Sequence, residues 1–138
     1  MQHPDAVLLS EAEIGTLRSL AGVMIPASAE YGVPGADDPA IFASLLASLG
    51  RDAADVRRAL EALIALCATP YADLPEARRA ELAAAFNARP DTAVATLHRV
   101  VLQCYYRDDR VMRALGLEQR PPFPKGFTLE QGDWSLLD

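Results

Sequence analysis

The sequence has few of the features that mark a catalytic centre, a bound cofactor or a membrane span. It holds two cysteines and two histidines in 138 residues, and neither cysteine is near a second ligand type at metal-binding spacing. It contains no phosphate-binding loop, dinucleotide-binding glycine pattern or haem attachment motif. Its longest apolar run is far shorter than the ~20 residues that a membrane span requires. We therefore predict no cofactor or metal site in this chain and no membrane span.

Positive charge is also scarce, with 13 Lys+Arg against 19 Asp+Glu and a formal net charge of −6. Nucleic acids and anionic membranes are bound by clustered cations, so the composition argues against both as partners. The first residues lack a basic region and a twin arginine, so we expect no export signal on this chain. This favours a cytoplasmic location, and a periplasmic location would require that a partner carry the signal.

The composition favours helices. Hydrophobic residues make up 51 % of the chain, alanine and leucine dominate, and β-branched residues are sparse. A chain of this length is about one domain and can bury a core without metals or disulfides. We predict an all-α fold, in which a small bundle of five to six helices (residues 1–116) is followed by an extended arm rich in proline and aromatic residues (residues 117–138).

Helix-start signals divide the first 116 residues. Ser10 and Glu13 form a capping box, which predicts a first helix that runs to about Met24 and is stopped by Pro26. A loop rich in Gly, Pro, Ser and Asp then covers residues 27–38. Capping residues, or a proline at the first helical position, predict later helix starts at Asp38, Asp52, Asp73–Glu76, Asp91, and Asp108 or Asp109. The helix that starts at Asp38 is predicted to end at Gly50.

The helix predicted for residues 91–106 organises the bundle. Apolar residues recur on it at three- and four-residue spacing, at Val94, Leu97, Val101, Cys104 and Tyr105. Val100 and Leu102 lie outside this stripe, so apolar side chains cover well over half of the circumference. Such a helix is usually buried between others, so we expect it to be central.

Few residues could carry acid–base chemistry. We interpret His98, on the 91–106 helix, as a hydrogen-bonded histidine in the core or at its boundary. The pairs Asp37–Asp38 and Asp108–Asp109 precede helices, which favours caps over catalytic acids. We therefore expect that the chain is not an enzyme. The alternative, a stand-alone enzyme, would use His98 and a carboxylate such as Asp108 as a general acid–base pair.

The two cysteines fall in apolar stretches. Cys67 and Cys104 are each predicted on the apolar face of a helix, where a cysteine behaves as a small hydrophobic residue. A disulfide, within the chain or to a partner, is the alternative.

Aromatic and basic residues concentrate in the last third of the chain. The aromatic residues are Tyr105, Tyr106, Phe123, Phe127 and Trp134, and the basic residues between them are Arg107, Arg110, Arg120 and Lys125. Protein interfaces are enriched in Tyr, Trp and Arg. The arm either contacts a partner or folds back on its own bundle. A third hypothesis is a self-associating structural protein whose arm swaps between identical copies.

Two segments carry a resemblance to a known family. In the first, a helix ends in Ile-Pro and a Gly-Ala-Asp loop leads to a second helix, with matches at Leu17, Leu20, Ile25, Pro26, Gly35, Ala36 and Asp37. In the second, a tyrosine-bearing helix leads to a Val-x-x-Ala-Leu-Gly turn, with matches at Tyr105, Tyr106, Val111, Ala114, Leu115 and Gly116. The chain thereby resembles the gluconate 2-dehydrogenase subunit 3 family.

This resemblance implies a function without catalysis. It implies a small helical subunit that binds and stabilises, for assembly or export, a large FAD-dependent sugar or alcohol dehydrogenase of the glucose-methanol-choline type. The FAD would belong to the partner, and a cytochrome c subunit would join in some complexes. The chain departs from many family members in lacking a visible twin-arginine signal. We predict a partner interface at Tyr105, Tyr106, Arg107, Pro122, Phe123, Pro124, Phe127 and Trp134, and a second at Tyr31, Val33 and Pro34 in the long loop.

Overall fold

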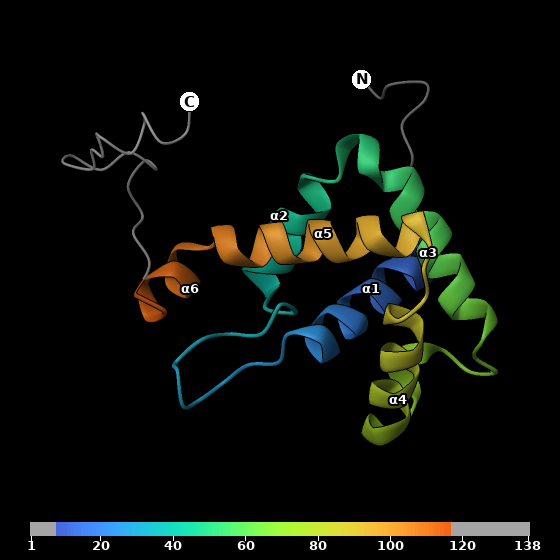
Figure 1. The fold of residues 1–138 in the computed structure, drawn as a ribbon, viewed down its shortest axis with the longest axis horizontal. Helices are drawn as coiled ribbons and strands as arrows, with labels where there is room; N and C mark the ends of the chain where they lie inside the picture. Colours follow the sequence, from blue (N-terminus) through green and yellow to red (C-terminus); the bar gives the residue numbers. More distant parts are fainter. Residues whose placement is uncertain (1–7, 117–138) are drawn as a thin grey trace, which may run out of the picture.

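The computed structural model describes residues 8–116, which fold into a bundle of helices (Figure 1). These residues form six α-helices and two 3₁₀ turns, named α1 (Glu11–Met24), α2 (Pro39–Ala47), η1 (Gly50–Asp52), α3 (Ala53–Ala65), η2 (Tyr71–Asp73), α4 (Glu76–Asn87), α5 (Thr92–Arg107) and α6 (Asp109–Ala114). The prediction of an all-α fold is confirmed. The predicted arm, residues 117–138, lies outside the described residues.

Four of the predicted caps are present. Ser10 and Glu13 form both hydrogen bonds of the capping box at the start of α1. At the starts of the other three helices a carboxylate accepts hydrogen bonds from free backbone N–H groups, and these residues are Asp38 for α2, Asp91 for α5 and Asp108 for α6. Each cap satisfies donors that the helix itself leaves unpaired, so local sequence sets these helix starts.

Helix α3 begins directly after Asp52 as predicted, but the predicted cap at Asp52 and the predicted end of α2 were wrong. Asp52 precedes α3 but has helical backbone angles and makes no cap hydrogen bond, and its carboxylate instead accepts from the Arg99 guanidinium at 2.8 Å. Helix α2 ends at Ala47 rather than at Gly50. Gly50 has a φ of +51° and begins the η1 turn that leads directly into α3.

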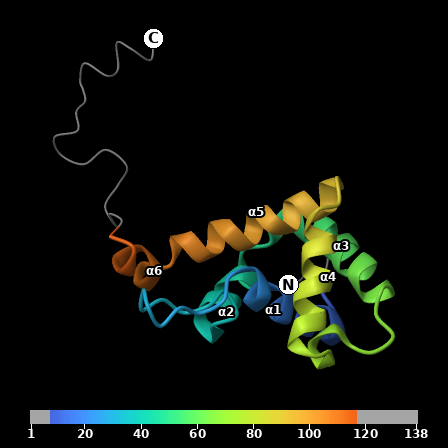
Figure 2. The same cartoon turned by 60° about the horizontal axis from the view of Figure 1, so that its bottom comes forward.

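Helix α5 contacts most of the other elements. It packs against α2, α3, α4, α6 and η1, and Figure 2 shows it running along one side of the molecule, above the other helices. Eight of its 16 residues are buried. The expectation that it is buried on most sides was wrong in part, because Leu102 is 42 % exposed and Tyr106 is 47 % exposed. One face of α5 is therefore open to solvent.

The hydrophobic core lies beneath α5. Its fully buried side chains come from every long helix and include Leu17, Leu20, Leu60, Leu63, Phe86 and Leu97. Figures 1 and 2 place the outer part of the loop 25–38 and α6 together at one end of the molecule, away from α4. No helix in the described part of the chain has the length and apolar character needed to span a membrane.

Candidate partner-binding surface

The loop 25–38, the last turn of α5 and α6 meet at one end of the molecule, here called the α6 end. The Tyr105 hydroxyl donates a hydrogen bond to the carbonyl oxygen of Pro34 at 2.7 Å, which joins residues 71 positions apart in the sequence. Burial raises the pKa of Tyr105, so the hydroxyl remains a donor at neutral pH. This contact fixes the loop onto α5.

Exposed apolar side chains gather at the same end. Tyr31 in the loop is 60 % exposed, Tyr106 is 47 % exposed and Leu115, after α6, is 42 % exposed. The rings of Tyr105 and Tyr106 meet edge to face, with centroids 5.1 Å apart and an interplanar angle of 85°. The buried ring of Tyr105 thus supports the exposed ring of Tyr106 from below.

The predicted interface residues take different positions in this arrangement. Tyr31, Tyr106 and Arg107 are exposed, and Val33 and Pro34 are half-buried. Tyr105 is only 3 % exposed, so it belongs to the core and positions the surface instead of contacting a partner. The remaining predicted residues, Pro122, Phe123, Pro124, Phe127 and Trp134, lie outside the described residues.

The loop has a hairpin-like tip. Ser28 and Val33 exchange two backbone hydrogen bonds, of 3.0 and 3.1 Å. Gly32 has a φ of +67°, a conformation that glycine adopts without steric cost and that lets the chain reverse between them. The tip therefore presents Tyr31 on a short, hydrogen-bonded turn.

A cluster of charged side chains attaches α6 to the start of α2. The Arg110 guanidinium donates to the Asp38 carboxylate at 2.7 Å and to the Asp108 carboxylate at 3.4 Å. The hydrogen bond from Arg110 lowers the pKa of Asp38. Asp38 thus caps α2 and holds α6 in place with the same carboxylate. The sequence indicated the cap but gave no signal for the partner 72 positions away.

At the base of the loop, Gly22 and Gly35 both pack closely against the carboxylate of Asp37. A β-carbon on Gly22 would lie 2.7 Å from Asp37 Oδ2, and a β-carbon on Gly35 would lie 2.7 Å from Asp37 Oδ1 and 2.9 Å from the backbone nitrogen of Ala27. The backbone contact leaves no space for a methyl group at Gly35, and a methyl group at Gly22 would require the Asp37 side chain to move. Ala36, between Gly35 and Asp37 in the loop, is buried, and its N–H donates to the carbonyl of Ile25 at 2.9 Å.

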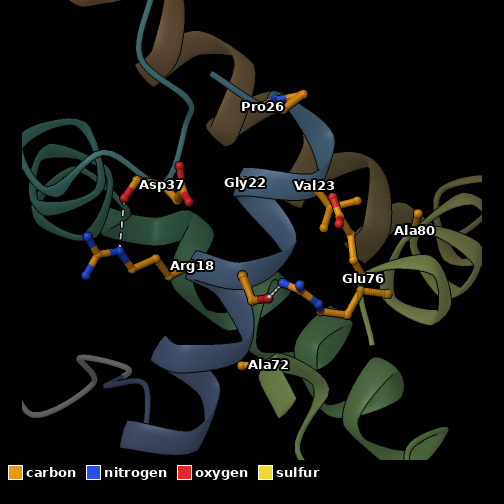
Figure 3. Close-up of a pocket in the computed structure, with 10 residues that line it drawn as sticks. Arg18, Gly22, Val23, Pro26, Asp37, Ala72, Glu76 and Ala80 are labelled. Atoms are coloured by element: carbon orange, nitrogen blue, oxygen red, sulfur yellow. Dashed lines mark hydrogen bonds between the residues drawn. The ribbon is translucent and has the colours of Figure 1, made fainter. Parts of the chain in front are cut away.

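A charged groove of about 490 Å³ lies between α1 and the first turns of α4 (Figure 3). Figure 3 shows Asp37 and Arg18 on one side of the groove and Glu76 of α4 on the other, and Arg79 of α4 also lines it. Both guanidinium groups are held by the protein, since Arg18 Nε donates to the carbonyl of Asp37 at 2.9 Å and Arg79 Nη1 donates to Ser19 Oγ at 3.3 Å. The lining residues include no histidine or cysteine, and the only hydroxyl, Ser19, accepts from Arg79.

A second groove, of about 390 Å³, is mostly apolar and is lined in part by Cys67, Pro70 and Tyr71. Cys67 is half-buried and its thiol donates to the carbonyl of Leu63 at 3.4 Å, while Cys104 is buried. Both thiols are free in the structure, and the alternative of a disulfide between them is not realised. Within residues 8–116, no group of three or more His, Cys, Asp or Glu side chains is arranged to hold a metal ion.

The structure does not bring together the acid–base pair of the enzyme hypothesis. His98 Nε2 lies 2.6 Å from Asn87 Oδ1, and burial lowers the pKa of the imidazole. Asp108 caps α6 beyond the other end of α5, ten residues further on, which corresponds to about 15 Å along the helix axis. His98 is half-buried and hydrogen-bonded, as predicted for a boundary histidine.

Comparison of the chain with protein-family models, with curated proteins and with solved structures gave no match. The resemblance to the gluconate 2-dehydrogenase subunit 3 family therefore stays a prediction from the short motifs.

Proposed function

We propose that this chain is a non-catalytic small subunit that binds and stabilises a large FAD-dependent sugar or alcohol dehydrogenase. Its contribution would be a surface that supports assembly or export of the partner, which would hold the FAD and carry out the oxidation. Two things support the proposal: the family resemblance and the geometry of the α6 end.

The observation that carries the proposal is the contact between the two segments that resemble the family. One is the loop that contains Pro34 and Asp38, and the other runs from Tyr105 through α6. They are far apart in the sequence, yet the Tyr105–Pro34 hydrogen bond and the Arg110–Asp38 ion pair join them into one surface. A surface assembled from both motifs explains why both would occur in one chain.

The physical character of this surface suits binding to a protein. Tyr31, Tyr106 and Leu115 expose apolar area, and aromatic rings give large contact area for little lost side-chain entropy. Because the loop is already hydrogen-bonded to α5, little ordering of the backbone is needed when a partner binds. Arg107 lies at the edge of this area, as is common at interfaces.

The test is affinity purification of the tagged chain from its native host, followed by an absorbance spectrum of the eluate. We expect a large partner with flavin absorbance, and haem absorbance would indicate that a cytochrome subunit joins. Elution of the chain alone and colourless, as a monomer, would contradict the proposal. A homodimer without flavin would contradict it in favour of self-association.

A matched pair of variants tests whether the α6 end is the binding surface. Tyr31→Ala with Tyr106→Ala should strongly reduce recovery of the flavoprotein, whereas Leu66→Ala should not. Leu66 is 53 % exposed and lies after α3, away from the α6 end, so it matches the tyrosines in exposure but not in position. Equal recovery with all variants would exclude this surface.

The arm is tested separately. We expect Phe123→Ala with Trp134→Ala to weaken the complex and to leave the helical circular dichroism of the free chain largely unchanged. Loss of the helical signal would instead assign the arm to the core of its own chain.

A further inference from the structure

Helix α5 carries a net positive charge in an acidic chain. Its 16 residues include no Asp or Glu, although the chain has a net charge of −6. The face that it leaves open to solvent carries Arg99, Leu102, Gln103, Tyr106 and Arg107. The open face of α5 therefore combines basic and apolar side chains.

The exposed residues of α5 form two parallel rows. Leu102 and Tyr106 are four residues apart and therefore neighbours on the helix surface, as are Arg99, Gln103 and Arg107. Arg99 Nη1 donates to the Gln103 side-chain oxygen at 3.3 Å, which aligns the polar row. An apolar row thus runs beside a basic one, and the apolar row ends at Tyr106 in the α6 end.

The charges of this face are only partly compensated. Arg99 pairs with Asp52 at 2.8 Å, but Arg107 contacts a hydroxyl, Ser48 Oγ at 3.5 Å. Arg51 belongs to η1, which packs against α5, and it has no ion pair among the described residues. Of these three arginines only Arg99 forms an ion pair among the described residues, whereas acidic residues outnumber basic ones in the chain as a whole.

We propose that this face of α5 docks an acidic segment of the large subunit, one that sets apolar side chains beside carboxylates. The inference rests on the proposed function and extends its surface from the α6 end along α5, through the shared Tyr106. Complementary charge selects this occupant, because the carboxylates of the partner would pair with Arg107 and Arg51 while its apolar side chains cover Leu102.

The test uses the purified complex of this chain with its flavoprotein partner. Charge reversal in Arg99→Glu with Arg107→Glu should weaken the complex by about tenfold or more, because like charges then face each other. The control is Arg78→Glu with Arg89→Glu. Arg78, in α4, forms an ion pair with Glu81, as Arg99 does with Asp52. Arg89, just after α4, has no ion pair among the described residues, and neither has Arg107. Circular dichroism confirms that both variants fold.

A salt titration of the wild-type complex gives a second readout that needs no variant. We expect the affinity to fall as salt rises, and to fall less steeply for Arg99→Glu with Arg107→Glu. Equal affinity of both double variants and a flat salt response would overturn the inference while the complex itself still supports the proposed function. Absence of any complex with the wild-type chain would overturn the proposed function instead.

Two other occupants are distinguished in the free chain. If residues 117–138 covered α5, Arg99→Glu with Arg107→Glu would shift the fluorescence of Trp134, the only tryptophan in the chain. If a second copy covered it, the wild-type chain would be a dimer and the variant a monomer. Either result would overturn the inference, and we expect an unchanged emission spectrum and a monomer.

Discussion

At the end of the molecule that contains α4, the side chains of Leu60, Phe86 and Leu97 are completely buried in the hydrophobic core. At the α6 end, Val111 anchors α6 in the same core, but the loop and the start of α2 are joined to α5 and α6 by directional contacts, such as the hydrogen bond from Tyr105 to Pro34 and the ion pair of Arg110 with Asp38. Apolar burial supplies most of the free energy of folding but sets no unique geometry for a loop. Hydrogen bonds contribute less and fix orientation.

We therefore expect the core contacts to determine the stability of the fold and the polar contacts at the α6 end to determine the shape of the candidate surface. Removing a core side chain should unfold the protein more easily without changing which residues face a partner. Removing a polar contact at the α6 end should cost little stability and release the loop that carries Tyr31. The following substitutions test this contrast.

The largest effect is expected from Phe86→Ala. The ring is fully buried, so its loss leaves a cavity and should lower the free energy of unfolding by about 3–5 kcal/mol. Chemical denaturation followed by circular dichroism measures this. Leu102→Ala is the control, because a side chain that is 42 % exposed should change the stability by about 0.5 kcal/mol or less. Equal losses would mean that α4 does not belong to the main core.

Gly35→Ala and Gly15→Ala should change stability in opposite directions. The new methyl at Gly35 would meet the backbone nitrogen of Ala27 at 2.9 Å, so we expect a loss of about 1–3 kcal/mol. Gly15 lies in α1 with nothing within 4 Å of the added carbon, so alanine should stabilise the helix by about 0.5–1 kcal/mol. Thermal unfolding of both variants checks the signs, and a stabilised Gly35→Ala would contradict the tight fit of the loop.

Tyr105→Phe isolates the contact that joins the loop to α5. Loss of the hydroxyl should reduce the stability by about 0.5–1.5 kcal/mol and speed hydrogen exchange in the loop 25–38. Tyr106→Phe is the matched control, since its exposed hydroxyl has no hydrogen bond among the described residues. Unchanged exchange in the loop of Tyr105→Phe would show that other contacts hold it.

The smallest effect concerns pH and the Arg110–Asp38 pair. Because Arg110 lowers the pKa of Asp38 in the folded state, the pair stabilises the fold above the ordinary carboxyl pKa of 3.8. That contribution is lost as the pH falls through the lowered value. The difference in stability between wild type and Arg110→Ala should therefore be larger at about pH 7 than at about pH 3. Arg113→Ala, on the same helix, should show no such pH dependence.

The helices could be predicted because their starts are encoded locally. Ser10 with Glu13, Asp38 with Pro39, Asp91 and Asp108 all act on backbone groups within three residues of themselves. Asp52 is no cap, because the η1 turn gives it helical backbone angles, and its carboxylate binds Arg99, 47 positions away. A competing partner so distant in the sequence gives no local signal.

The candidate surface was predicted in part for the same reason. The sequence marked the loop around Tyr31 and the segment at Tyr106 as separate candidates, and nothing in it indicated that they meet. Their meeting depends on Tyr105 reaching Pro34, which also buries Tyr105 and removes it from the surface. The open face of α5 was missed because the sequence does not distinguish Val100 from Leu102, two apolar residues outside the stripe. In the structure Val100 is buried, whereas Leu102 is exposed.

The fit of Gly22 and Gly35 around Asp37 has a consequence for how this sequence can change. Alanine at Gly22 would improve the intrinsic helix propensity of α1, but its methyl would meet the Asp37 carboxylate at 2.7 Å. If Asp37 has first become alanine, that carboxylate is gone and the nearest atom of residue 37 is its β-carbon, 3.2 Å away. The two substitutions are therefore epistatic, because Gly22→Ala must displace the carboxylate when Asp37 is present and no longer meets it after Asp37→Ala.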